Sequence, residues 1–198
     1  MTVIRPIETA STLQRQDNAN NNAPDGSFSP MKHHKRTSST PFVRVGPSGV
    51  HGLGAFATRD LPAEAFLGLY EGRRYTKAEI ATKVWDDQLT YLFTLSNNET
   101  IDGAKGGNAT RHLNHSCEPN CEAVEEYDEG GELVLKFQTL VAVDAGDELF
   151  IDYSLTADDG SPPSKYPCHC GSPNCRGTML APPDETPSEA ASADVQPA

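Results

Sequence analysis

The sequence predicts one mostly-β domain flanked by two polar tails. Its 198 residues suit one ordinary domain better than two. Short apolar runs recur along the chain, and many of its 16 glycines and 15 prolines lie between them. One stretch alone has the pattern of a helix. Several short strands with few helices indicate a mostly-β fold.

Each element has a local justification. Candidate strands, rich in leucine, aromatic and β-branched residues, span residues 43–45, 65–70, 91–95, 133–139 and 148–153. The expected helix spans residues 77–89. Thr76 suits its N-cap, and Glu79, three positions later, completes a capping box.

Residues 1–40 and 181–198 are expected to be disordered tails, because both are polar and bury too little apolar surface to offset the entropy of ordering. A basic cluster at residues 32–36 is a nuclear-targeting signal, a nonspecific contact patch or simply part of a solvated tail. The N-terminus lacks the apolar stretch of a secretory signal, and no run of 18 apolar residues occurs. We therefore expect an intracellular protein that does not span a membrane.

The chain is strongly acidic, with a formal net charge of -12 and a pI near 4.8. This charge favours basic partners and disfavours direct binding to the phosphates of nucleic acid. Residues 118–132 hold seven acidic residues and no Lys or Arg. That segment is either a solvated loop or a surface that attracts a basic peptide.

Three cysteines lie within eight residues: Cys168, Cys170 and Cys175. This spacing is poor for a secreted disulfide framework and typical of a loop that wraps a zinc ion. Tetrahedral zinc needs a fourth ligand, for which Cys117 is the natural candidate and Cys121 and His169 are weaker ones. Buried free cysteines are the alternative.

Residues 106–121 form the second distinctive segment, which is too polar for a plain strand or an amphipathic helix. Its amides, imidazoles and hydroxyls suit either a ligand pocket or a hydrogen-bonded knot of loops, and its chemistry alone leaves both open.

Four motifs together resemble the SET-domain family of protein-lysine methyltransferases. They are HGLG at residues 51–54, RHLNHSCEPNC at 111–121, ELFIDY at 148–153 and the cysteine cluster at 168–175. They occur in the family's order and cover roughly residues 41–180. The resemblance implies small β-sheets around a pseudoknot, with a SET catalytic domain at 41–157 and a zinc-binding post-SET region at 158–180.

The same resemblance implies the site residues. S-adenosylmethionine would be bound by Gly52, Leu53, Gly54, Arg111, Asn114, His115 and Met179. Tyr153 takes the place of the catalytic tyrosine, and Tyr91 that of a tyrosine in the lysine channel. Ile151 occupies the position that tunes how many methyl groups are added, and its aliphatic side chain favours di- or trimethylation. Cys117, Cys168, Cys170 and Cys175 would hold a structural zinc ion.

The expected activity is therefore methylation of lysine in a basic protein, most simply a histone tail, in the nucleus of a eukaryote or a host cell or in the cytoplasm of a bacterium. The alternative is an inactive SET-type module that binds a peptide or partner. Sequence-specific nucleic-acid binding and membrane association are not expected.

Overall fold

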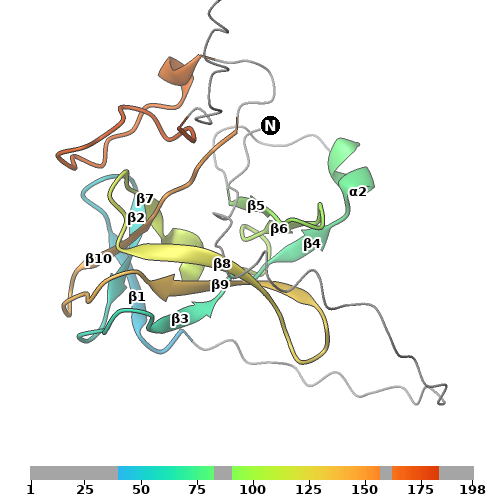
Figure 1. The fold of residues 1–198 in the computed structure, drawn as a ribbon, viewed down its shortest axis with the longest axis horizontal. Helices are drawn as coiled ribbons and strands as arrows, with labels where there is room; N and C mark the ends of the chain where they lie inside the picture. Colours follow the sequence, from blue (N-terminus) through green and yellow to red (C-terminus); the bar gives the residue numbers. More distant parts are fainter. Residues whose placement is uncertain (1–39, 83–90, 157–161, 183–198) are drawn as a thin grey trace, which may run out of the picture.

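The computed structural model describes residues 40–82, 91–156 and 162–182, which form three small sheets and a few short helical turns (Figure 1). The strands are β1 Val43–Pro47, β2 Leu53–Ala57, β3 Phe66–Leu69, β4 Arg73–Tyr75, β5 Leu92–Thr94, β6 Thr100–Asp102, β7 Asn114–His115, β8 Cys121–Tyr127, β9 Leu133–Thr139 and β10 Glu148–Ile151. The helical turns are α2 Lys77–Ala81, η2 Ala109–His112 and η3 Pro163–Lys165. The expected mostly-β fold of small sheets is confirmed.

The four-stranded sheet, in the order β1-β2-β10-β7, positions the polar segment. β7 pairs with β10 in parallel, so that Asn114 lies opposite Phe150 and His115 opposite Ile151. The Asn120 side chain reinforces this pairing, because its amide nitrogen donates to Glu148 O at 2.8 Å and its oxygen accepts from Phe150 N at 2.8 Å. Two motifs far apart in the sequence are thereby held side by side.

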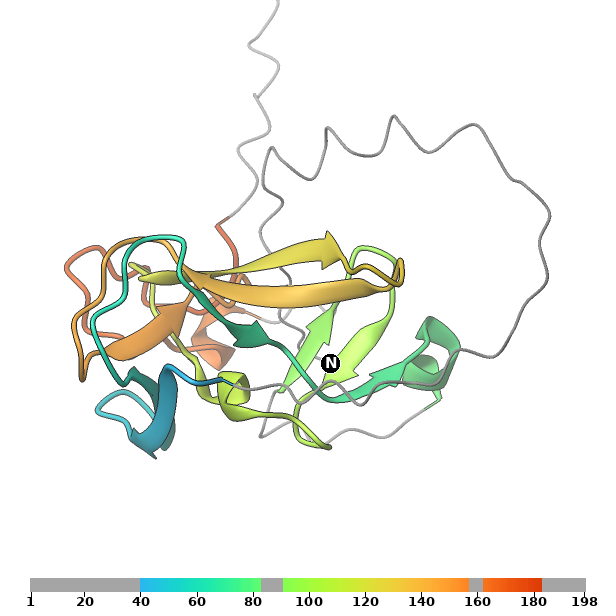
Figure 2. The same ribbon diagram turned by 90° about the horizontal axis from the view of Figure 1, so that it is seen from below.

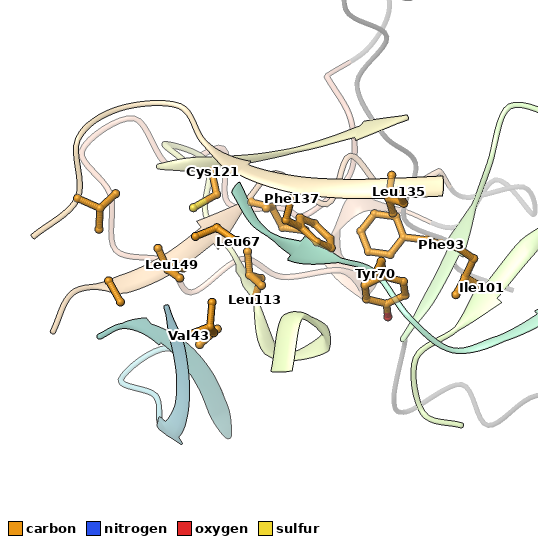
Figure 3. Close-up of a cluster of buried hydrophobic side chains, with 14 of the residues drawn as sticks. Val43, Leu67, Tyr70, Phe93, Ile101, Leu113, Cys121, Leu135, Phe137 and Leu149 are labelled. Carbon is orange, nitrogen blue, oxygen red and sulfur yellow. The ribbon is translucent and has the colours of Figure 1, made fainter. Parts of the chain in front are cut away.

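The other two sheets have the orders β3-β9-β8 and β4-β6-β5. The β1–β2 hairpin and the β4-β6-β5 sheet lie at opposite ends of the β3-β9-β8 sheet (Figure 2). The core beneath β9 is aromatic: the ring centroid of Tyr70 lies 4.7 Å from that of Phe93 and 5.7 Å from that of Phe137, both edge-to-face (Figure 3). Such pairs add specific geometry to the burial of large apolar area.

All five expected strands are present, within a few residues of their predicted ends. α2 begins as expected, since Thr76 Oγ1 accepts from Glu79 N and the Glu79 carboxylate accepts from Thr76 N. It ends at Ala81 with Thr82 as C-cap, and residues 83–90 of the predicted helix lie outside the described residues. The two predicted tails also lie outside them, except for Thr40, Ala181 and Pro182.

Five strands were not predicted: β2, β4, β6, β7 and β8. β4, β6 and β7 have three or fewer residues each, too few to display a period of two.

Within the described residues, no helix is long and apolar enough to cross a membrane.

Candidate functional site

A pocket of about 450 Å³ lies where five segments of the described chain meet, one of which is the chain just before β5, with Tyr91. The other four are the β1–β2 loop, the segment around β7, the chain after β10 and the cysteine-rich region. Eight of the predicted cofactor and channel residues line it: Gly52, Leu53, Tyr91, Arg111, Asn114, His115, Tyr153 and Met179. The fold therefore brings together motifs separated by more than a hundred residues in the sequence.

Two of the predicted cofactor and channel residues do not line this pocket. Ile151 is 2% exposed and belongs to the hydrophobic core, and it is not among the residues that line the pocket. Gly54 is also absent from the lining and has a different constraint: a Cβ atom there would lie 2.1 Å from Glu148 Oε1. In this structure Gly54 leaves room for a carboxylate.

The Tyr153 hydroxyl is fixed in direction. It donates to Leu113 O at 3.0 Å, and burial raises the pKa of Tyr153 above its ordinary value. The phenol therefore stays protonated at neutral pH. Because its proton is directed at Leu113, the oxygen offers its lone pairs to any other group that approaches.

Tyr91 is held by a residue that the motifs did not indicate. The buried Tyr70 hydroxyl donates to Tyr91 O at 2.8 Å, and burial raises the pKa of Tyr70 above its ordinary value. Gly103 makes room for this hydroxyl, because a Cβ atom there would lie 2.4 Å from it. The Tyr91 ring also packs edge-on against His112 at a centroid distance of 6.3 Å.

Arg111 and His112 form a neighbouring pair on the pocket wall. Arg111 Nε donates to His112 Nε2 at 3.1 Å, which requires a neutral imidazole that carries its proton on Nδ1. Burial lowers the pKa of His112, and the adjacent Arg111 charge lowers it further. A second contact, from Arg111 Nη1 to Gly103 O at 3.2 Å, orients the guanidinium.

His115 connects the pocket to the cysteines. Its Nδ1 accepts from Tyr153 N at 3.1 Å, so the neutral ring carries its proton on Nε2, which lies 3.4 Å from Cys117 Sγ. Burial lowers the pKa of His115 to about 4, against the opposing effect of Asp152. The 3.5 Å approach of His115 Nδ1 to Asp152 Oδ1 is therefore not an ion pair at neutral pH.

Four cysteines converge as the sequence predicted. The sulfur atoms of Cys117, Cys168, Cys170 and Cys175 all lie within 4.8 Å of one another, and those of Cys117 and Cys168 are 3.7 Å apart. Four thiolates about 2.3 Å from a tetrahedral zinc ion would be separated by about 3.8 Å. The cluster can therefore hold zinc with its four ligands already present. Neither of the weaker candidates, Cys121 and His169, belongs to this group among the described residues.

An ion pair joins the cysteine loop to the end of β10. Arg176 Nη1 lies 2.8 Å from Asp152 Oδ2, and Arg176 Nη2 donates to Asp152 Oδ1 at 2.9 Å. The Asp152 hydrogen bond raises the pKa of Arg176 further. This bidentate contact holds the cysteine-rich loop against the strand that ends beside Tyr153.

The acidic segment is mostly built into the structure. It contains β8, and six of its seven acidic side chains have a partner: Glu118 with Asn174, Glu122 with Gln138, Glu125 with Ser96, Glu126 with Lys136, Asp128 with its own turn and Glu132 with Arg74. Of these partners, Lys136 and Arg74 are cations. The segment is thus an ordered strand and turn that keeps much of its negative charge.

Comparison with known proteins agrees with this architecture. The SET domain family model matches residues 52–154. The chain is 34% identical over 150 residues to Histone-lysine N-methyltransferase 2B of Homo sapiens, 38% over 133 to Histone-lysine N-methyltransferase SETD2 of Mus musculus, and 34% over 158 to Histone-lysine N-methyltransferase trithorax of Drosophila virilis.

These alignments cover 74%, 65% and 76% of this chain but 5%, 5% and 4% of the respective relatives. The chain therefore spans only about 4–5% of the length of these three relatives. The matched residues run from the pocket glycine Gly52 to the residue after Tyr153. The chain belongs to the SET-domain family.

Proposed function

We propose that this chain transfers methyl groups from S-adenosylmethionine to lysine side chains of a basic protein, with a histone tail as the first candidate substrate. The observation that carries the proposal is the convergence of Tyr91, Asn114, His115 and Tyr153 on one pocket. Asn114, His115 and Tyr153 come from motifs that resemble those of the family, and the relatives are named histone-lysine methyltransferases.

The pocket suits the methyl donor in size and chemistry. A volume of about 450 Å³ falls within the range of ordinary cofactor sites. Apolar contacts are available from Leu53, Leu155 and Met179, while Asn114 and Arg111 offer polar groups. When bound there, S-adenosylmethionine supplies an electrophilic methyl group on a positively charged sulfur.

The protein's part is to hold a neutral lysine amine in the correct orientation. Lysine has an ordinary pKa of about 10.4, and both desolvation and a nearby positive charge disfavour its ammonium form. The Tyr91 and Tyr153 rings provide a partly dry wall for this purpose. We assign Tyr153 the role of accepting an amine N–H, since its own proton is directed at Leu113 O, which leaves the nitrogen lone pair free to attack.

A zinc ion in the cysteine cluster would have a structural role. Four cysteine ligands leave no open position for catalysis. Tyr166, Pro167 and Cys168 of the same region line the pocket, so ordering this loop completes the wall of the cofactor site. Structural zinc therefore couples to cofactor binding in this proposal.

A basic substrate fits the charge of the chain. The formal net charge is -12, and Glu118 and Glu122, beside and on β8, are hydrogen-bonded to the neutral amides of Asn174 and Gln138. We propose that this field attracts a basic peptide and that the attraction weakens with salt. Action on histones would place the protein on chromatin.

The test is methyl transfer from labelled S-adenosylmethionine onto core histones and a whole-cell extract, with products located by gel and mass spectrometry. Methyl-lysine that depends on Tyr153 is the expected result and would also identify the substrate. If neither mixture is methylated and the wild-type protein does not bind the cofactor, the chain is better described as an inactive binding module.

A further inference from the structure

The loop between β1 and β2 supplies Val50, His51 and Gly52 to the pocket wall, and Leu53, the first residue of β2, follows them. Ser48 anchors this loop through hydrogen bonds to its backbone. The Ser48 hydroxyl oxygen accepts from Val50 N at 3.0 Å and from His51 N at 3.3 Å. Because both contacts use the oxygen as an acceptor, the hydroxyl proton needs an acceptor of its own.

Glu148 on β10 provides that acceptor. The Ser48 hydroxyl donates to Glu148 Oε2 at 3.0 Å. The other carboxylate oxygen, Oε1, accepts from Asn114 Nδ2 at 2.8 Å. One carboxylate therefore serves two donors, one on the pocket loop and one on the pocket floor, although Glu148 itself does not line the pocket.

The same contacts decide the orientation of the Asn114 amide. Its Nδ2 also lies 3.3 Å from His51 O and 3.2 Å from Leu53 O. All three neighbours are acceptors, so the nitrogen faces them and the amide oxygen is the group that Asn114 can offer to a ligand. Without the carboxylate, the amide loses its shortest contact.

The surroundings are shaped to hold this carboxylate. A Cβ atom on Gly54 would lie 2.1 Å from Glu148 Oε1 and 2.7 Å from its Cδ, and 3.1 Å from the Ser48 Cβ. A side chain at position 54 would displace the carboxylate from both donors. The second glycine of the HGLG motif is therefore explained by Glu148.

We propose that Glu148 is a positioning residue for cofactor binding, which acts through Ser48 on the β1–β2 loop and through Asn114 on the pocket floor. This inference rests on the proposed function. Loss of the carboxylate should loosen the loop and release the amide, and thereby weaken binding of the cofactor. It should leave the Tyr153 contacts intact, so that turnover at saturating cofactor stays close to wild type.

The experiment measures the Kd of S-adenosylhomocysteine by calorimetry, and in parallel the KM for S-adenosylmethionine and kcat. Glu148→Ala should raise the Kd and KM by about tenfold or more, as expected for a lost charged hydrogen bond. Glu148→Gln has one acceptor oxygen in place of two and cannot serve both donors, so a rise of about threefold to tenfold is expected. Ser48→Ala removes the hydrogen bond between the loop and Glu148, and it should raise the Kd and KM by a similar factor of about three to ten.

Glu125→Ala is the matched control, because Glu125 also accepts from a serine hydroxyl and a backbone N–H, those of Ser96, and does not line the pocket. Its Kd should stay within about twofold of wild type. Circular dichroism establishes that each variant is folded; if Glu148→Ala is not, Glu148→Gln and Ser48→Ala decide.

Folded Glu148 and Ser48 variants with a wild-type Kd, or with losses in kcat alone, overturn the positioning role. A wild-type protein that does not bind S-adenosylhomocysteine overturns the proposed function itself. The two failures are therefore distinguishable.

Discussion

The backbone N–H of Tyr153 donates to His115 Nδ1 at 3.1 Å. This contact joins the chain just after β10 to the polar segment, and it uses the backbone of Tyr153 and the ring of His115. Replacement of the Tyr153 side chain can therefore leave the local scaffold intact. The same ring places its Nε2 3.4 Å from Cys117 Sγ, so the pocket and the cysteine cluster share a wall.

Zinc removal should weaken cofactor binding as well as stability. Purified protein is expected to contain about one zinc per chain, and Cys117→Ser should lose it, because a structural site needs all four ligands. The pocket wall around Tyr166 to His169 should then loosen, which raises the Kd for S-adenosylhomocysteine. Metal analysis and calorimetry measure the two effects.

Cys121→Ser is the control for this prediction. Cys121 is buried, but its sulfur lies outside the cluster and contacts Asn120 Oδ1 at 3.3 Å, a contact that a serine hydroxyl can replace. Zinc content should stay at about one per chain. A Cys117→Ser protein that retains zinc and cofactor affinity would contradict the assignment.

Two glycines of the same region should respond differently to alanine. Gly54→Ala forces a methyl group against the Glu148 carboxylate and should destabilise the fold by about 1–3 kcal/mol. Gly49→Ala meets no atom within 4 Å and needs no positive φ, so stability should change by less than about 1 kcal/mol. Urea denaturation compares the two, and equal effects would show that the close approach at Gly54 is not decisive.

The Asp152–Arg176 pair should matter more than a surface ion pair. Asp152→Asn preserves an oxygen for Ser154 N but leaves the Arg176 guanidinium without its counter-charge, at an expected cost of about 1–3 kcal/mol. Nε of Arg176 is already buried without a hydrogen-bond partner among the described residues. This nitrogen therefore offers no contact that could compensate for the lost ion pair.

Glu126→Gln is the matched control for that substitution. Its partner is Lys136 at 3.1 Å, and the Glu126 side chain is 40% exposed, so a loss below about 1 kcal/mol is expected. Thermal or urea unfolding of the two variants measures the difference. If Asp152→Asn costs no more than Glu126→Gln, the ion pair does not hold the cysteine loop in place.

Much of the site was predictable because it rests on residue type and spacing. Three cysteines in one short loop predicted a metal cluster with Cys117 as the candidate fourth ligand, and the structure brings these four sulfur atoms together. The polar segment at 106–121 left two interpretations open, a pocket or a hydrogen-bonded knot, and the structure contains both features. Asn114 lines the pocket, while Asn120 is bonded to the β10 backbone.

The supporting residues were not predictable from the sequence for physical reasons. Glu148 is an ordinary strand residue until Gly54, Ser48 and Asn114 meet it across the fold. Tyr70 looks like a core aromatic until its hydroxyl reaches Tyr91 O. β8 was not recognised as a strand because it is rich in charged residues. Glu122 and Glu126 are stabilised there by Gln138 and Lys136 of the neighbouring strand β9. Pairings between residues far apart in the chain cannot be recognised from the local sequence pattern.

The most direct test of the central claim is Tyr153→Phe in the methyl-transfer assay, with S-adenosylhomocysteine binding measured on the same preparations. The variant keeps the ring and the backbone contact to His115, and loses only the hydroxyl directed at Leu113 O. The proposal predicts a fall in kcat of about 100-fold, the cost of a misplaced amine, with the Kd within about twofold of wild type. Undiminished turnover in a protein that binds the cofactor normally would contradict the assignment of Tyr153 as the catalytic tyrosine.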